Sequence, residues 1–176
     1  MNLIAIFLVA VSLSMDAFSL SLLYGTLNLK RSVVRGISLT VGVFHFFMPL
    51  FGYLFGDILS SFLIFNPDLL VGTIFIILSI QMFLSLRQEE EIMEITSIFS
   101  YLLFGFTVSL DSFTVGIGLG GLQEGILLPC IIFSITSCVF TYLGLVLGGR
   151  LASKFGQIST ILGSILLFVL GLFYIF

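Results

Sequence analysis

Two aspartates stand at the same place in two copies of one short motif. Ser-Met-Asp-Ala-Phe-Ser at 14–19 recurs as Ser-Leu-Asp-Ser-Phe-Thr at 109–114, which pairs Asp16 with Asp111. Both motifs lie in long apolar stretches. A carboxylate at the centre of a lipid bilayer costs about 2.5–3.5 kcal/mol to insert. Protonation, water or a bound cation must therefore compensate for each aspartate.

Hydroxyl side chains surround both aspartates at matching offsets of −4, −2 and +3. They are Ser12, Ser14 and Ser19 around Asp16, and Thr107, Ser109 and Thr114 around Asp111. On a continuous helix, the offsets −4 and +3 share a face with the carboxylate. Such oxygens suit Mg²⁺, Ca²⁺ and Mn²⁺. The pattern predicts one cation site. The alternative is that the hydroxyls bond the preceding helical turn and the aspartates are neutral packing residues.

A single histidine, His45, lies in the middle of another apolar stretch. Pro49 follows four residues later and removes the backbone hydrogen bond to the His45 carbonyl. We predict His45 as a further metal ligand; the alternatives are a proton carrier and a histidine hydrogen-bonded between helices. Gln81 and Ser79 are weaker candidates for additional oxygen ligands.

The composition decides which elements can position these residues. Of 176 residues, 59% are hydrophobic and 9% are charged, whereas an ordinary soluble domain has about 25% charged residues. Apolar stretches of about 20 residues, long enough to cross a bilayer, recur along the chain. Six basic residues and a net charge of −3 give no nucleic-acid footprint. No phosphate loop or activated nucleophile is found, so we expect neither an enzyme nor a resident cofactor.

The apolar stretches predict six transmembrane helices, at 3–27, 33–56, 68–86, 96–120, 125–148 and 157–176. Every basic residue falls in the first, third or fifth connection: Lys30, Arg31, Arg35, Arg87, Arg150 and Lys154. The positive-inside rule then places these connections in the cytoplasm and both termini outside.

The repeated motif divides the chain into residues 1–88 and residues 89–176, with three helices in each half. Because three is odd, the second half must cross the membrane in the opposite direction, as in the inverted repeats of many transporters. Both aspartates are then about 20 Å deep. The predicted fold is an all-α membrane protein of two inverted three-helix repeats in a single membrane domain.

The segments 14–18 and 109–119 resemble the paired signature of the MntP-type manganese efflux pumps, and the likeness runs over essentially the whole chain. The resemblance implies an Mn²⁺ exporter of the bacterial cytoplasmic membrane in which Asp16 and Asp111 are essential. Some members of that family carry an acidic residue where this chain has His45.

The expected mechanism is alternating access, in which the two halves rock about a midplane site that binds Mn²⁺ as the transported substrate. An ion gradient or the membrane potential would drive it, with protons or another counter-ion as the exchange partner. The alternatives are a transporter of another cation or of a small solute, and a sporulation or scaffold membrane protein without transport. The lipid bilayer is the other expected partner, and the oligomeric state is open.

Overall fold

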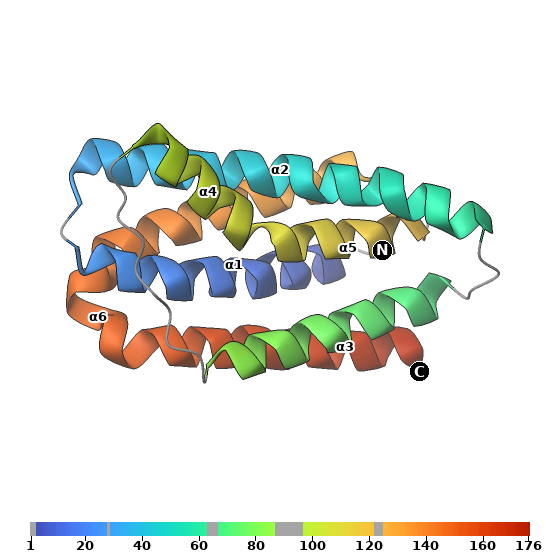
Figure 1. Ribbon diagram of the computed structural model, residues 1–176. Helices are drawn as coiled ribbons and strands as arrows, with labels where there is room; N and C mark the ends of the chain where they lie inside the picture. The colour runs from blue at the N-terminus through green and yellow to red at the C-terminus, as the bar shows by residue number, and fades with distance from the viewer. Residues whose placement is uncertain (1–2, 28, 63–66, 87–96, 122–124) are drawn as a thin grey trace.

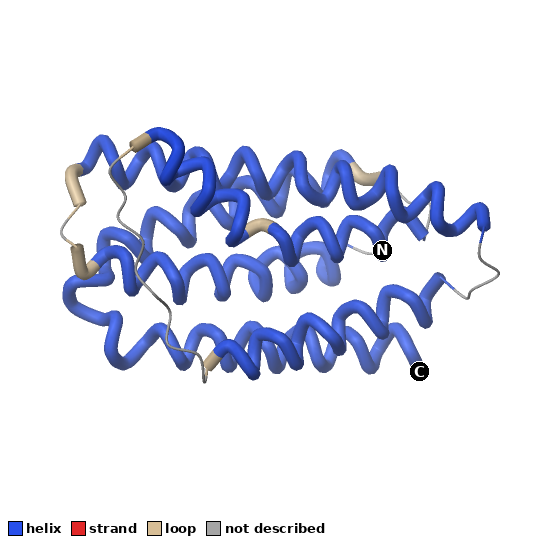
Figure 2. The backbone as a smooth tube through the Cα atoms, viewed as in Figure 1, coloured by secondary structure: helices blue, strands red, loops and turns tan. Residues whose placement is uncertain are grey.

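The computed structural model describes residues 3–27, 29–62, 67–86, 97–121 and 125–176. Within them the chain is helical and has no strand (Figures 1 and 2). The helices lie along one long axis and form an elongated bundle (Figure 1). They are α1 (Leu3–Gly25), α2 (Arg31–Phe62), α3 (Pro67–Ser85), α4 (Ile98–Val108), α5 (Leu110–Gly121) and α6 (Leu127–Ile175).

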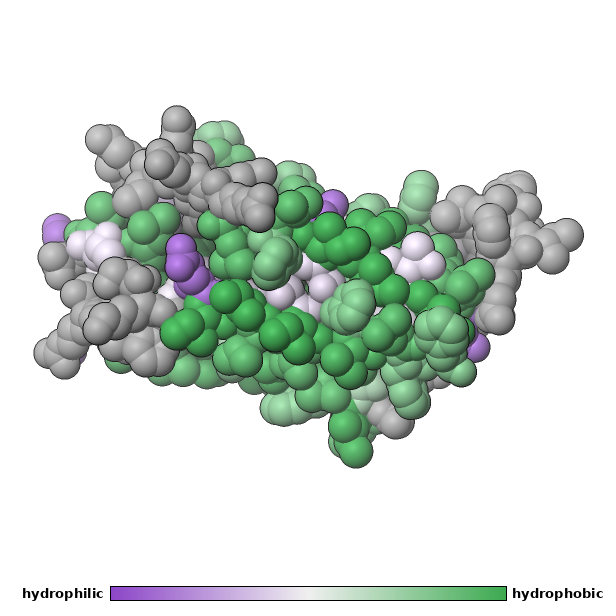
Figure 3. All heavy atoms as spheres, turned by 90° about the horizontal axis from the view of Figure 1, so that it is seen from below, coloured by the Kyte–Doolittle hydropathy of each residue, from purple (hydrophilic) through white to green (hydrophobic). Residues whose placement is uncertain are grey.

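The helices provide enough apolar length for up to six membrane spans. Five segments qualify individually: Leu3–Gly25, Arg31–Ile58, Asp68–Ser85, Leu127–Gly148 and Gly156–Ile175. A sixth span is the bent pair of α4 and α5. Large apolar side chains such as Phe47, Phe83 and Phe173 point outward, at 46%, 53% and 74% exposure. Figure 3 shows one such apolar face, which is suited to lipid. The chain is a multi-pass membrane protein.

The predicted continuous helix 96–120 is wrong, because it breaks at Ser109. The backbone N–H and the side-chain hydroxyl of Ser109 both donate to the Phe106 carbonyl, at 3.2 and 3.1 Å. This tight turn ends α4, and α5 starts again at Leu110 with its axis bent by 44°. Neither glycine nor proline stands at the break, so the usual sequence signals for a helix end are missing.

The predicted connection between the last two spans is confirmed, because one span ends at Gly148 and the next begins at Gly156, but the predicted loop from Arg150 to Gln157 is wrong, because the backbone remains helical there. α6 runs from Leu127 to Ile175 and folds back on itself at one end of the bundle (Figure 1). α2 likewise extends to Phe62, beyond the predicted end at residue 56. The side chains of Arg150 and Lys154, and the predicted connections at 87–94 and 122–124, lie outside the described residues.

The helices of residues 1–88 pack mainly on helices of residues 89–176. α1 packs on α6, α2 packs on α4, α5 and α6, and α3 packs on α5 and α6. Packing across the halves, rather than within them, therefore builds the bundle. The division into residues 1–88 and 89–176 stays a prediction from the repeated motif. In the structure the helices of each half pack between those of the other half.

Glycines allow the closest of these contacts, in two seams. In the α1–α6 seam, a Cβ added to Gly25 would lie 2.5 Å from the Leu145 carbonyl oxygen, and one on Gly148 would lie 2.6 Å from the Gly25 Cα. In the α2–α5 seam, Cβ atoms on Gly52 and Gly116 would overlap the backbone of the facing helix. Backbones that touch in this way are typical of small-residue interfaces in membranes.

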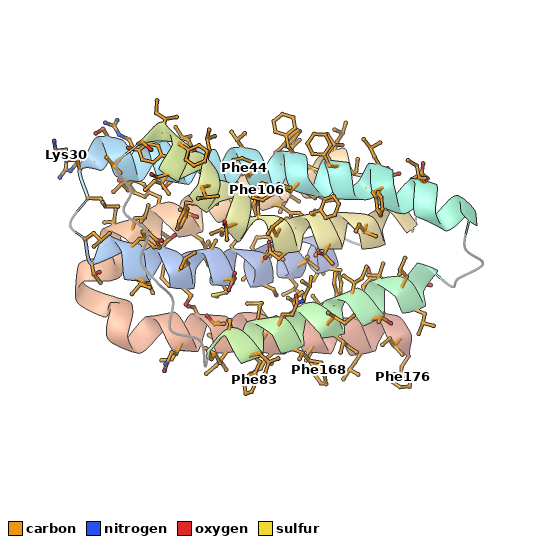
Figure 4. All side chains as sticks on the ribbon, in the orientation of Figure 1. Lys30, Phe44, Phe83, Phe106, Phe168 and Phe176 are labelled. Atoms are coloured by element: carbon orange, nitrogen blue, oxygen red, sulfur yellow. The ribbon has the colours of Figure 1, made fainter. Side chains whose placement is uncertain are left out.

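Both termini lie toward one end of the bundle, and Lys30 lies at the other (Figures 1 and 4). The beginnings of α2 and α4 and the reversal of α6 share the Lys30 end. A chain whose two termini lie at the same end of the bundle must cross the membrane an even number of times. The side of the membrane that each end faces stays a prediction.

Candidate metal-binding site

The two motif aspartates line the same cavity inside the bundle. Asp16 comes from α1 and Asp111 from α5, and the cavity has a volume of about 170 Å³. The other lining residues come from α1, α3 and α6: Leu13, Leu78, Gln81, Met82, Ser85 and Leu167. The structure thus brings together the two residues that the repeated motif singled out.

The break at Ser109 sets the environment of Asp111. Because α5 restarts at Leu110, Asp111 lies in the first turn of a helix, where the helix dipole favours negative charge. One carboxylate oxygen, Oδ1, accepts hydrogen bonds from the Ser112 backbone N–H at 2.6 Å and from the Ser112 hydroxyl at 3.4 Å. The other, Oδ2, is buried and has no hydrogen-bond partner among the described residues. One oxygen is therefore oriented by the protein and the other is free to bind.

The charges of the two aspartates favour a cation in this cavity. The two carboxylates interact electrostatically, and they repel each other when both are ionised. The basic side chains that the structure describes, on Lys30, Arg31 and Arg35, are at the end of the bundle, in or next to the first turns of α2. None of them lines the cavity. A bound cation would remove the repulsion.

The other polar groups of the cavity come from α3 and are neutral side chains whose oxygens can coordinate a cation. Gln81 supplies an amide oxygen, and the Ser85 hydroxyl, which donates to the Met82 carbonyl at 2.7 Å, keeps lone pairs for a ligand. No group of three or more His, Cys, Asp or Glu side chains converges in the described part of the chain. The donor set is thus two carboxylates with amide and hydroxyl oxygens, which suits a partly hydrated Mn²⁺, Mg²⁺ or Ca²⁺.

Two of the predicted hydroxyl ligands lie outside the cavity. Ser12 is fully buried and donates to the Leu8 carbonyl at 2.8 Å, one turn back in α1. Thr107 is exposed on α4 and donates to the Leu103 carbonyl at 2.9 Å. The bend at Ser109 is the reason for the position of Thr107, because an offset of −4 shares the face of Asp111 only on an unbroken helix.

The remaining predicted residues also do not line this cavity. Ser14 shares a 3.0 Å hydrogen bond with Ser137 of α6. Ser109 closes α4, and His45 is buried on α2. Ser19 donates to the Gly156 carbonyl at 2.9 Å. The motif hydroxyls thus serve mostly to close helix turns and join helices.

Ser85 lines the cavity, and sequence reasoning did not single it out. The signal was present, because the α3 residues 78, 81, 82 and 85 recur at the spacing of one helix face. Gln81 was only a weak candidate, since a polar residue in an apolar helix does not show which neighbour it faces. The contact with the aspartates depends on how α3 packs against α5 and α6.

Fold and cavity together define a class: multi-pass helical membrane proteins with two carboxylates on a cavity within the bundle. Residues 28–175 match the family described as "Putative manganese efflux pump". The chain belongs to this family.

Several relatives that carry the same description, with the name MntP, match along nearly their whole length. The chain is 36% identical to the protein of Bacillus pumilus and 37% identical to that of Geobacillus thermodenitrificans; each match covers 99% of this chain and 96% of the relative. It is 34% identical to the protein of Methanobrevibacter smithii, over 97% of this chain and 95% of the relative. No solved structure matches the chain.

Proposed function

We propose that this chain exports a divalent metal cation, Mn²⁺ in particular, across the bacterial cytoplasmic membrane. The observation that carries the proposal is the shared cavity of Asp16 and Asp111, two carboxylates from different helices with no basic residue among the described lining residues. The names of the relatives, manganese efflux pumps, support Mn²⁺ as the substrate. No resident cofactor is part of the proposal.

The cation would enter from the Lys30 end of the bundle, which the positive-inside rule assigns to the cytoplasm. Ser85 is the last residue of α3, and Gln81 is one turn further into the bundle. Both line the same cavity as the two aspartates. These oxygens would replace part of the water around the cation as it moves inward to the carboxylates.

Release to the other side requires alternating access, and the two glycine seams indicate which helices move together. α1 is in backbone contact with the first span of α6, and α2 is in backbone contact with α5. We propose that each seam holds a rigid helix pair, and that the pairs move against each other about the break at Ser109. The binding residues Asp16 and Asp111 would then belong to different moving pairs, so that their separation changes during transport.

The seams also support the inverted repeat. Gly25 and Gly120 follow the two motif aspartates at the same interval. Gly25 packs on Gly148 of α6, and Gly120 packs near Gly56 of α2. Corresponding helices of the two halves thus use corresponding glycines for corresponding contacts. This correspondence is the relationship expected of two related halves with opposite orientation.

The driving force would be an ion gradient or the membrane potential, with protons or another cation moving the opposite way. The chain has no nucleotide-binding motif. Export against a gradient therefore needs an exchange partner or the electrical potential. Two carboxylates that change between metal-bound and protonated states are suited to proton exchange.

Transport by purified protein in lipid vesicles tests the proposal, with a Mn²⁺-sensitive dye inside the vesicles. Asp16→Asn and Asp111→Asn should abolish the flux, because each removes a charge with little change in shape. Asp57→Asn is the matched control, since Asp57 is an exposed α2 carboxylate outside the cavity. Flux at the parental level in both cavity variants would end the carboxylate model.

Two further arms of the assay separate the alternatives. Competition by Ca²⁺, Mg²⁺, Fe²⁺ and Zn²⁺ against Mn²⁺ identifies the preferred cation. A parent protein that moves no cation under any gradient would favour the scaffold alternative.

A further inference from the structure

The single histidine has one ring nitrogen that the fold leaves open. His45 is fully buried, and its Nδ1 lies 3.0 Å from the Val41 carbonyl oxygen. A carbonyl can only accept a hydrogen bond, so Nδ1 must carry the proton. In the neutral ring, Nε2 then presents a bare lone pair. Among the described residues, Nε2 has no hydrogen-bond partner.

This combination is characteristic of a metal ligand. A metal-bound histidine usually donates its other ring N–H to a carbonyl or carboxylate, which fixes the tautomer and the ring orientation. A buried acceptor that nothing satisfies has a free-energy cost, because it has lost its hydrogen bonds to water. A cation that coordinates Nε2 would remove that cost during transport.

The face of α2 that carries His45 points into the bundle. Gly42, His45, Pro49, Gly52 and Gly56 recur at three- and four-residue spacing and share one face. The flanking members contact the second half of the chain: Gly42 packs on Cys138 of α6, and Gly52 packs on Phe113 of α5. His45 therefore faces the interior between α5 and α6.

The register of the α2–α5 seam gives the level of His45 along the bundle. α2 and α5 run in parallel, with Pro49 beside Gly116 and Tyr53 beside Gly120. One helical turn back from Pro49, the same register brings His45 to the level of the first turn of α5, where Ser109 and Ser112 lie. Both serines are fully buried. On α5, Asp111 lies on a different face, which lines the cavity with α3, and its Oδ1 accepts a hydrogen bond from the Ser112 hydroxyl at 3.4 Å.

The repeat gives a second argument for the same placement. The motifs equate Ser14 with Ser109, and the glycine pairs Gly52–Gly56 and Gly144–Gly148 equate His45 with Ser137. Ser14 and Ser137 are hydrogen-bonded at 3.0 Å. The observed pair Ser14–Ser137 therefore corresponds to the pair Ser109–His45. By this correspondence we expect His45 to lie beside Ser109.

An aromatic pair lies on the neighbouring face of α2, above the break. Phe44 of α2 and Phe106 of α4 meet edge to face with ring centroids 6.1 Å apart (Figure 4). Phe106 is exposed on the outside of the bundle, whereas His45 is fully buried. The imidazole is therefore held in a site without lipid contact.

We propose that His45 Nε2, with the Ser109 and Ser112 hydroxyls, is a second binding station for the transported cation. The inference rests on the proposed function and extends it. The first station is the Asp16–Asp111 cavity. The second station lies on the other side of the first turn of α5. Movement at Ser109 opens the passage between the two stations. Because imidazole nitrogen binds transition metals better than Mg²⁺ or Ca²⁺, this station selects for a transition-metal cargo.

Electron spin-echo spectroscopy of Mn²⁺ bound to the purified chain tests this directly. With one histidine in the chain and an affinity tag that contains none, any imidazole nitrogen coupled to Mn²⁺ belongs to His45. We expect nitrogen modulation at saturating Mn²⁺, and a change of its frequencies when the histidine is labelled with ¹⁵N. The labelling needs no substitution, so the result is independent of how a variant folds.

Two variants complete the test. His45→Gln should still bind Mn²⁺ at the carboxylates but lose the nitrogen modulation, and its Mn²⁺ transport should become at least about tenfold more sensitive to Mg²⁺. Asp16→Asn with Asp111→Asn should keep the nitrogen-coupled Mn²⁺. Mn²⁺ bound to the parent chain without nitrogen modulation overturns the second station and leaves the proposed function intact. Unchanged flux in the aspartate variants overturns the proposed function instead.

Discussion

The hydroxyls of Ser14 and Ser137 lie 3.0 Å apart and join α1 to α6 in the buried interior. Ser14 is two residues from Asp16, yet its hydroxyl faces the opposite half of the chain and not the cavity. The neighbouring Ala17 and Leu145 belong to one apolar cluster on the same side of α1. One face of α1 thus binds α6, while another presents the carboxylate.

Gln81 should contribute to cation affinity. Gln81→Leu removes an amide oxygen from the cavity, and we expect Mn²⁺ binding to weaken about tenfold, which corresponds to about 1.4 kcal/mol. Gln81→Glu should retain Mn²⁺ binding, because a carboxylate replaces the amide. Titration calorimetry of the purified protein measures both. Ser79→Ala is the control, since the Ser79 hydroxyl donates to the Ser164 carbonyl, away from the cavity. Equal affinity in Gln81→Leu and the parent would exclude Gln81 as a ligand.

Bound Mn²⁺ should stabilise the fold. A ligand at about 100 times its dissociation constant adds about 2.7 kcal/mol to the stability of a one-site protein. Thermal unfolding in detergent should therefore shift upward with Mn²⁺ and return to the starting value when a chelator removes it. Asp16→Asn should lose the part of this shift that binding in the cavity supplies, and Asp57→Asn should keep the whole shift. An equal shift in both variants would place the stabilising cation elsewhere.

Substitutions in the glycine seams should destabilise the bundle. A Cβ on Gly52 would overlap the Phe113 carbonyl oxygen, and one on Gly148 would overlap the Leu22 carbonyl oxygen. Overpacking of this kind costs about 1–3 kcal/mol, so Gly52→Ala and Gly148→Ala should unfold at lower temperature. Gly125→Ala is the matched control, because nothing lies within 4 Å of its Cβ position. Parental stability in both seam variants would contradict the backbone contacts.

The two ends of the bundle should face different compartments. Ser32→Cys and Gly125→Cys place a thiol at exposed positions near opposite ends, in a background where Cys130 and Cys138 are replaced by alanine. A membrane-impermeant maleimide added to intact cells should label Gly125→Cys and not Ser32→Cys. After permeabilisation both should react. Labelling of Ser32→Cys in intact cells would reverse the predicted orientation.

The sequence alone determined the membrane character, most of the spans and the two aspartates of the cavity. The spans are predictable because the bilayer demands about 20 apolar residues for each helix, whatever the packing. Asp16 and Asp111 are predictable because an ionisable group in such a stretch is costly and needs a compensating function. Both signals are local and need no knowledge of neighbouring helices.

Tertiary structure decided the break at Ser109 and the partner of each polar side chain. Thr107 has the motif spacing but points outward, since the bend at Ser109 separates α4 from the face of Asp111. Gln81 and Ser85 line the cavity because α3 packs against α5 and α6. Local sequence cannot encode such placements, because a hydroxyl or amide in an apolar helix is satisfied equally well by its own backbone or by a neighbouring helix. Packing between helices that are distant in the sequence decides whether the polar group bonds to its own backbone or to a neighbouring helix.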